Sequence, residues 1–396
     1  MGTLREGAVR QLLCLLLGTG LLASWSGGRQ EVKRLVEGGV EIVLNHIEPY
    51  RVPGEPFSVV LEKEFVIDAE SPDLFKAGLT DIFRFGVGND GSIYIAQRPR
   101  KDVPVVFKFD RTGHLQDSFG RIGQGPGEIE RCAYFGVIGR DEVYVLDAQG
   151  SRITTFASSG ELMKETRLPT SLIGAIPLEN GNFLAPRGEV SPNEGQEEIA
   201  FDLLDRQFVL VKAIHSFKFP IPRMGAAKVN AYVTNPICSF DSHRIYAGLP
   251  GKDYEVLVFD LDGNLLRKIR KDYAPVVVTA AFREETLARL PQGSPVAGRL
   301  EFPDHKPSFQ YIFADEKGRI FVSTSEVDKA WGQNICDVFN ASGVFIGRVA
   351  VGYFDLLRMY WAGVTLDVVA KNGRFYVLHE KENGYKELIV SKAIWR

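Results

Sequence analysis

Charged and aromatic side chains follow strand-like segments along the chain, and their types suit the capture of a ligand. Arginine and lysine bind carboxylates, phosphates and acidic peptides. Connecting loops usually carry such residues, because a rigid scaffold holds the loops in place. The candidate binding residues are Arg98, Arg100, Lys101, Arg121, Gln124, Asp147, Arg152, Lys252, Asp253, Trp331, His379 and Glu380.

The histidines and carboxylates decide whether a metal centre is expected. A catalytic zinc takes about three protein ligands that converge on one point. The chain has 6 histidines, and only His379 ends a strand on the expected binding face. We therefore expect no cofactor. Hydrolysis or elimination assisted by Ca²⁺ or Zn²⁺, built on Asp147, Asp253, His379 and Glu380, stays open as the alternative.

A glycine-rich stretch, FGRIGQGPGEI (119–129), could in principle hold a phosphate. A dinucleotide fingerprint needs the spacing G-x-G-x-x-G before a helix. Counted from Gly123, the third glycine position is occupied by Glu128, and the next residues read as strands. Glycine permits positive φ and proline stiffens the backbone. The stretch is therefore interpreted as a tight crossing between two strands.

A short pattern recurs along the chain: a polar turn followed by β-forming residues with an aromatic or apolar centre. It appears as DGSIYIA (90–96), RDEVYVL (140–146), ENGNFLA (179–185), DSHRIYA (241–247), EKGRIFV (316–322) and KNGRFYV (371–377). Most copies lead into a second strand that ends in a hairpin corner, such as Asp-Gly or Ser-Gly. Repeats of this kind indicate an array of similar sheets.

The strands are apolar on both sides, so both faces of each sheet must be covered. A closed ring of small antiparallel sheets meets this requirement. We therefore predict an all-β, six-bladed β-propeller, in which 57–68 supplies the missing outer strand of the sixth blade and closes the ring. The segment 271–307 departs from the pattern and is predicted to be an insertion between blades 4 and 5. Its helix, 278–290, has Phe282, Leu287 and Leu290 as its apolar residues, and we expect it either to cover the channel as a lid or to patch a blade edge.

The first residues differ from the rest. A basic start, an apolar run from Leu12 to Leu22 and a small polar stretch have the layout of a signal peptide. The predicted domains are a signal peptide (1–26), a lead-in segment (27–56) and the propeller (57–396). The expected location is secreted or periplasmic, with no membrane span after leader removal. Cys132, Cys238 and Cys336 are expected to be buried apolar residues rather than a disulfide framework.

The segments GSIYIA, FKFDRTGHLQDSFGRIGQGPGEI and DEVYVLDAQGSRITTFASSGEL carry a family resemblance. They resemble the secreted bacterial six-bladed β-propeller proteins related to NHL repeats, most clearly over 38–168. The resemblance implies the fold and the compartment. The wider NHL group includes zinc-dependent peptide-amidating lyases, sensor domains and interaction platforms, and the lyase histidines match no positions in this chain.

The net charge of −3 gives no support for nucleic-acid binding. We expect a binding or scaffolding module that recognises a peptide, glycan or protein at the mouth of the propeller channel, rather than an enzyme. The alternative is a metal-assisted lyase or lactonase-type hydrolase of the six-bladed class.

Overall fold

The computed structural model of the protein describes residues 31–139, 141–169, 172, 174–191, 196–220, 229–232, 236–251, 253–288, 290, 293–294, 297–328, 332–351 and 367–396. The predicted signal peptide, 1–26, lies outside these residues. All the elements named below belong to the unit formed by Val32–Arg396.

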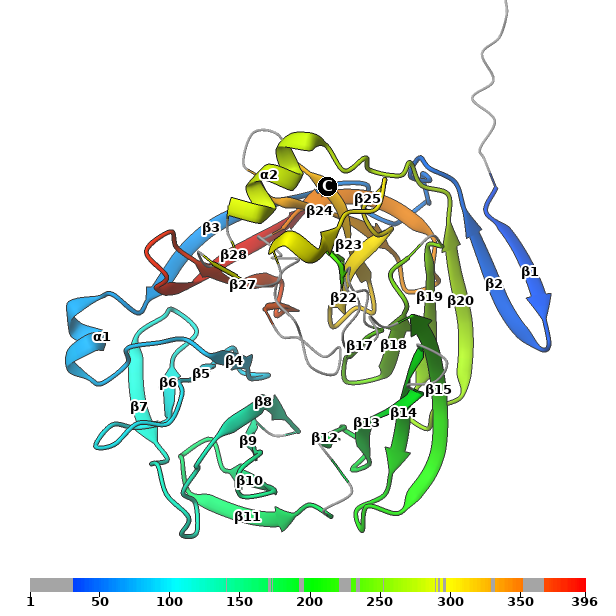
Figure 1. Cartoon of the computed structure of the whole chain (residues 1–396). Helices are drawn as coiled ribbons and strands as arrows, with labels where there is room; N and C mark the ends of the chain where they lie inside the picture. Colours follow the sequence, from blue (N-terminus) through cyan, green and yellow to red (C-terminus); the bar gives the residue numbers. More distant parts are fainter. Residues whose placement is uncertain are drawn as a thin grey trace, which may run out of the picture. The chain divides into compact units, whose positions relative to one another are not determined.

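Six antiparallel sheets, the blades, stand around one axis (Figure 1). Blade 1 consists of β4 (Arg84–Val87), β5 (Ile93–Ala96), β6 (Val106–Phe109) and β7 (Leu115–Phe119). Blade 2 consists of β8 (Cys132–Ile138), β9 (Glu142–Asp147), β10 (Arg152–Phe156) and β11 (Leu162–Arg167). Blade 3 consists of β12 (Ile176–Pro177), β13 (Phe183–Ser191), β14 (Gln196–Leu204) and β15 (Leu210–Pro220).

The other three blades repeat this order from the axis outward. Blade 4 consists of β17 (Ile237–Phe240), β18 (Arg244–Gly248), β19 (Glu255–Asp260) and β20 (Leu265–Lys271). Blade 5 consists of β22 (Phe309–Ala314), β23 (Ile320–Val327), β24 (Asn334–Phe339) and β25 (Phe345–Ala350). Blade 6 consists of β26 (Val368–Lys371), β27 (Arg374–Glu380), β28 (Lys386–Trp395) and β3 (Val59–Asp68). The predicted six-bladed propeller is confirmed.

The ring closes through an N-terminal strand, as predicted from residues 57–68. β3 pairs antiparallel with β28, from Val59 opposite Trp395 to Asp68 opposite Glu387. The backbone N–H of Arg396 donates to the carbonyl of Ser58 at 3.0 Å, which extends the pairing beyond the strand. A short helix, α1 (Pro72–Lys76), follows β3 and leads into blade 1. Both ends of the propeller therefore lie in one sheet.

The lead-in segment forms a hairpin that the sequence pattern did not predict. β1 (Lys33–Glu37) pairs with β2 (Val40–Asn45), and β2 pairs parallel with β20. Blade 4 thus gains two outer strands, visible in dark blue in Figure 1. The Asn45 side chain then reaches blade 5, where its oxygen accepts from the Phe345 N–H at 2.8 Å and its nitrogen donates to the Gly343 carbonyl at 3.0 Å.

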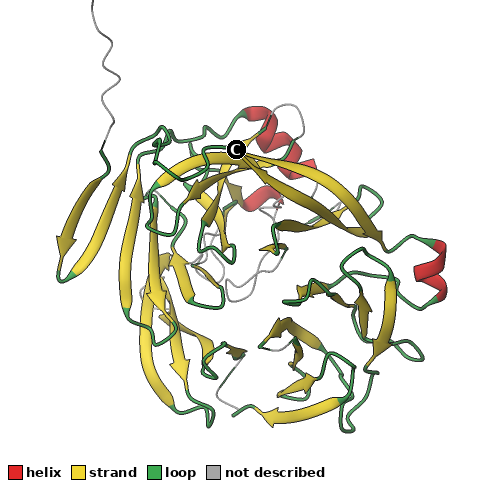
Figure 2. Ribbon diagram, turned by 180° about the vertical axis from the view of Figure 1, so that it is seen from behind, coloured by secondary structure: helices red, strands yellow, loops and turns green. Residues whose placement is uncertain are grey.

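The insertion between blades 4 and 5 contains a helix, as expected, although it is shorter than 278–290. α2 spans Ala280–Ala288, followed by the 3-10 turn η1 (Ala297–Arg299) and β21 (Leu300–Glu301), which pairs parallel with β16 (Val229–Asn230). Figure 2 shows the helices in red against the yellow strands. Of the apolar residues expected for this helix, Leu287 is 38% exposed. Phe282, which was also expected to be apolar in this helix, stacks on Tyr232 with ring centroids 6.0 Å apart.

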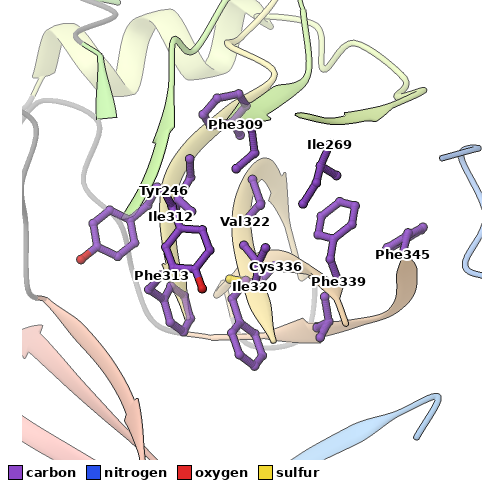
Figure 3. Close-up of a cluster of buried hydrophobic side chains, with 14 of the residues drawn as sticks. Tyr246, Ile269, Phe309, Ile312, Phe313, Ile320, Val322, Cys336, Phe339 and Phe345 are labelled. Atoms are coloured by element: carbon purple, nitrogen blue, oxygen red, sulfur yellow. The ribbon is translucent and has the colours of Figure 1, made fainter. Parts of the chain in front are cut away.

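The core lies in the seams between neighbouring blades. The aromatic centre of the repeated pattern is almost fully buried in blades 1, 2, 4, 5 and 6, at Tyr94, Tyr144, Tyr246, Phe321 and Tyr376. Each of these rings packs in a cluster that includes the following blade. Figure 3 shows Tyr246 of blade 4 in one cluster with Phe309 and Ile312 of blade 5. The repeated aromatic residues therefore join the sheets into a ring.

The corner between the third and fourth strands of a blade packs on the outer strand of the previous blade. At Gly113, in blade 1, φ is +87°, and a Cβ atom would lie 2.6 Å from the Phe65 ring of β3. Gly160, in blade 2, meets Phe119 of blade 1 in the same way, at 2.7 Å. Glycine is required at these corners both for the positive φ and for the close approach.

Replacing Gly113 should therefore weaken the seam that closes the ring. We expect Gly113→Ala to lower the free energy of unfolding by about 2–5 kcal/mol, of which about 1–2 comes from positive φ and the rest from overlap with Phe65. Gly373→Ala is the matched control, because Gly373 has φ of +70° and nothing within 4 Å of the new Cβ. Urea denaturation gives the free energy of unfolding of both variants. Equal losses in the two would show that the contact with Phe65 does not contribute to stability.

Removal of β3 tests ring closure directly. A chain of residues 69–396 should lose the sharp cooperative unfolding transition, because the first and last blades would no longer share a sheet. A chain of residues 57–396 keeps β3, lacks the β1–β2 hairpin and the segment from 46 to 56, and should keep a sharp transition. Thermal melts followed by circular dichroism compare the two, and a sharp native melt of the shorter chain would contradict the closure.

Candidate functional site

A cavity lies on the propeller axis, at the end of the inner strands where the turns between first and second strands gather. We call this end the turn end, and the opposite end, with the glycine-rich crossing, the loop end. The cavity has about 920 Å³ of empty space, including open solvent at its mouth. All six blades contribute to its lining: Phe85, Gly86, Val87, Asn89, Gly136, Val137, Ile138, Tyr144, Pro177, Glu179, Phe240, Asp241, Ser242, Ala314, Asp315, Glu316, Val369, Ala370 and Lys371.

The walls of this axial cavity are apolar and its rim is polar. The walls come from the inner strands, for example Phe85, Val137 and Val369, and the rim comes from the turns. Binding sites for small molecules and chain segments commonly combine a mostly apolar concave surface with a few polar groups that fix the orientation of the ligand. The lining of the axial cavity has this composition.

Hydrogen bonds between blades hold the turns of the rim in place. Each blade contacts the next through a turn residue, so these bonds form a belt around the axis. In ring order the contacts are Asn89 to the Gly139 carbonyl, the Gly139 N–H to Glu179, Asn180 to the Leu261 carbonyl, Arg244 to the Ala341 carbonyl, the Gly373 N–H to Glu316, and Asn372 to the Gly88 carbonyl. The rim is therefore preorganised, which lowers the entropy cost of binding.

Among the described residues that line the cavity, Lys371 is the cation. Its ammonium donates to the Val87 carbonyl at 3.0 Å, across the seam between blades 6 and 1. Burial lowers the pKa of Lys371, and the negative charges of Asp141 and Glu179 act in the opposite direction. A ligand that enters the cavity meets this lysine beside several carboxylates.

The predicted residues Asp147 and Arg152 lie at the loop end, and they hold the glycine-rich crossing rather than face its exterior. Asp147 is fully buried, and its carboxylate accepts from the N–H groups of Glu130 and Arg131 at 3.0 and 2.9 Å. It also accepts from the N–H groups of Gln149 and Gly150. These bonds occupy the oxygens that could have bound a metal ion or a ligand.

Arg152 completes the support of the crossing. Its guanidinium donates to the Glu128 carbonyl at 2.6 Å and to the Gln124 carbonyl at 3.2 Å. Glu128 itself caps the turn: the N–H of Gly125 and the guanidinium of Arg121 donate to its carboxylate, and these bonds lower its pKa. The interpretation of 119–129 as a strand crossing agrees with this arrangement.

The other arginines and Gln124 of the predicted set are at the loop end and pair with neighbours of their own blade or crossing. Arg98 is 2.9 Å from the Asp81 carboxylate, and Arg100 donates to the Thr80 hydroxyl at 2.9 Å. Gln124 donates to Glu130 at 2.8 Å. The Arg121 side chain is 79% exposed, so it is accessible to a ligand at the loop end.

The remaining predicted residues divide between exposed and paired positions. His379 Nδ1 lies 2.9 Å from Glu387, its partner on β28, and Glu380 is exposed beside it. Lys101 and Asp253 are exposed at the loop end. Lys252 and Trp331 lie outside the described residues.

The cysteines follow the prediction. Cys132, Cys238 and Cys336 are buried and free. Burial raises the pKa of the Cys132 thiol to about 12, so the thiol stays protonated at neutral pH. Among the described residues, no three His, Cys, Asp or Glu side chains form a group suited to a metal ion.

A buried charged pocket, which we call the seam pocket, lies between blades 4 and 5. Lys271 and Asp337 have fully buried side chains, with Nζ and Oδ2 3.3 Å apart. Arg348 Nε lies 2.9 Å from Asp337 Oδ1, an ion pair without the geometry of a directed hydrogen bond. The Tyr254 hydroxyl donates to Asp337 at 2.8 Å. Burial lowers the pKa of Lys271, while Asp337 opposes that shift.

Sequence analysis missed the seam pocket, and it expected the channel mouth among the loops of the loop end, whereas the axial cavity opens at the turn end. The signal for the seam pocket was Asp337, a charged residue between apolar neighbours in the strand NICDVF. The seam pocket has room for about one water molecule, so we interpret it as a structural ion cluster. The rim of the axial cavity lies in the repeated turns, which sequence analysis treated only as corners.

The comparison with protein families agrees with this architecture. The family model DUF5128, described as a 6-bladed beta-propeller, matches residues 86–222. No curated protein matches the sequence. A Bacteroides fragilis protein whose name describes it as exported is 12% identical, with a TM-score of 0.49 over 90% of this chain and 99% of that chain.

Two enzymes of known structure are also similar in fold. Virginiamycin B lyase from Staphylococcus aureus is 10% identical, with a TM-score of 0.41 over 84% of this chain and 99% of that chain. A gluconolactonase from Xanthomonas campestris is 10% identical, with a TM-score of 0.40 over 86% of this chain and 98% of that chain. At these identities the likeness concerns the fold alone. The protein is a six-bladed β-propeller.

The role of Asp147 can be tested by stability. Asp147→Ala should lower the free energy of unfolding by about 3–5 kcal/mol, because it leaves four backbone N–H groups without their acceptor and removes the anion 3.7 Å from the Arg152 guanidinium. Arg121→Ala, on the exposed side of the same crossing, should change it by less than about 0.5 kcal/mol. Urea denaturation of both variants provides the measurement. A stable Asp147→Ala protein would show that the carboxylate does not organise the crossing.

Proposed function

We propose that this propeller is a binding or scaffolding module and that its ligand, a peptide, glycan or protein segment, enters the axial cavity. The main support for this proposal is the lining of that cavity, to which all six blades contribute apolar and polar residues. A site built from every blade cannot form in a smaller piece of the fold. Its rim is also held by bonds between blades, which suits recognition without a large rearrangement.

The proposed location is outside the cytoplasm, in a secreted or periplasmic protein of the NHL-related bacterial type. This proposal rests on the signal-peptide layout of the first 26 residues and on the family resemblance. Within the part of the chain that the structure describes, no helix is long and apolar enough to cross a membrane.

The loop end is the competing position for the ligand, since Arg121 and Lys101 are exposed there. The two positions are at opposite ends of the inner strands, so substitutions can separate them. Ala314 lines the cavity at the end of β22, and a large side chain at this position would fill part of the space.

We expect Ala314→Trp to weaken ligand binding at least about 10-fold, which corresponds to about 1.4 kcal/mol. Arg121→Ala is the matched control at the loop end and should bind as the parent does. The ligands are first selected with the parent protein from peptide and glycan libraries, and affinities are then measured by calorimetry. Melting temperatures confirm that both variants are folded. Loss of binding in Arg121→Ala with full binding by Ala314→Trp would move the site to the loop end.

A further inference from the structure

The outermost strand of blade 4, β1, has one unpaired edge. In the order of that sheet β1 is the terminal strand and pairs with β2 on one side. All five of its residues are exposed, and Val36 is 73% exposed. Figures 1 and 2 both show the β1–β2 hairpin at the outside of the blade, with no described element beyond it. Unpaired edges of this kind template pairing with another strand.

Two of the three charges on β1, those of Lys33 and Glu37, are placed symmetrically about its centre, and the third, Arg34, pairs with Glu41 of β2. The sequence of β1 is KRLVE, so a lysine and a glutamate stand two positions on either side of Leu35. If a second copy of β1 paired antiparallel about Leu35, each Lys33 would lie opposite a Glu37, and the two Leu35 side chains would face each other. Like charges on an edge normally oppose self-pairing, whereas these charges are complementary in a two-fold arrangement.

The backbone of the hairpin permits this register. The turn residues Gly38 and Gly39 both have positive φ, +58° and +84°, as in a two-residue hairpin turn. In such a hairpin the flanking pair, Glu37 and Val40, is hydrogen-bonded, and the pairs alternate along the ladder. The N–H and carbonyl groups of Arg34 and Val36 therefore point to the free edge.

Pairing about Leu35 would use these free groups. Arg34 of one copy would lie opposite Val36 of the other, so the two pairs would exchange about four backbone hydrogen bonds. Lys33 and Glu37 would then be in the non-hydrogen-bonded pairs, where side chains are closest. Backbone geometry and side-chain charge thus specify the same register.

From this agreement we propose that the chain forms a two-fold dimer by antiparallel pairing of β1 with β1 of a second copy, centred on Leu35. One short strand pair buries less surface than the 1,200 Å² or so of a stable interface. The dimer should therefore be weak, with a dissociation constant of about 10 µM to 1 mM. This inference does not depend on the ligand site, since β1 is at the periphery of the ring and the cavity is at its axis.

Charge reversal provides the test. Sedimentation equilibrium of the full chain, from about 10 µM to 1 mM, should show reversible dimerisation. In a dimer of the Lys33→Glu variant, glutamates would face each other at positions 33 and 37. In a dimer of the Glu37→Lys variant, lysines would face each other there, so each variant alone should associate at least 10-fold more weakly. A mixture of the two variants should associate again, because each glutamate then meets a lysine.

A backbone variant checks the pairing independently of charge. Val36→Pro removes an N–H that points to the free edge, so it should abolish dimerisation while the β1–β2 pairing and the melting temperature stay unchanged. A monomeric parent protein at 1 mM would overturn the proposal. So would a dimer that neither charge reversal nor Val36→Pro weakens, because its interface would then lie elsewhere.

Discussion

The structure depends on the pairing of β3 with β28, which places the two ends of the propeller in one sheet. A ring of sheets buries its seams only if every blade has two neighbours. With blade 6 complete, its Tyr376 packs with Phe85 of blade 1, and the last seam is as apolar as the others. A segment more than 300 residues away in sequence thus supplies the contact that turns an open array into a closed ring.

Closure of the ring also completes the set of hydrogen bonds around the propeller axis. The belt of hydrogen bonds around the turn end runs through all six blades, and its last step, from Asn372 to the Gly88 carbonyl, exists only because blades 6 and 1 are neighbours. The turns between first and second strands that take part in this belt also form the rim of the axial cavity, whereas Leu261 and Ala341 belong to corners farther from the axis. Architecture and candidate binding site therefore share residues, and Lys371 both bridges a seam and faces the cavity.

Charged residues serve the fold in several places where a sequence suggests chemistry. Asp147 looked like an exposed ligand at the end of a strand, but it accepts four backbone N–H bonds beneath the glycine-rich crossing. Asp337 and Lys271 pair in the seam between blades 4 and 5. A buried carboxylate needs such partners, because an unpaired buried charge is strongly unfavourable. The availability of a carboxylate to a ligand thus depends on contacts that are distant in sequence.

The sequence by itself determined the repeated strands, the six blades, the closing strand and the buried cysteines, because apolar periodicity and hairpin corners are local signals. The insertion helix was placed within a few residues, although Leu287 turned out exposed. Only the tertiary structure decided that β2 joins β20, that Asp147 lies beneath the crossing and that the axial cavity opens among the turns. These features arise where segments from different blades meet. A repeat pattern specifies each blade, whereas the seams and the axis are specified by side chains that come together only when the ring closes.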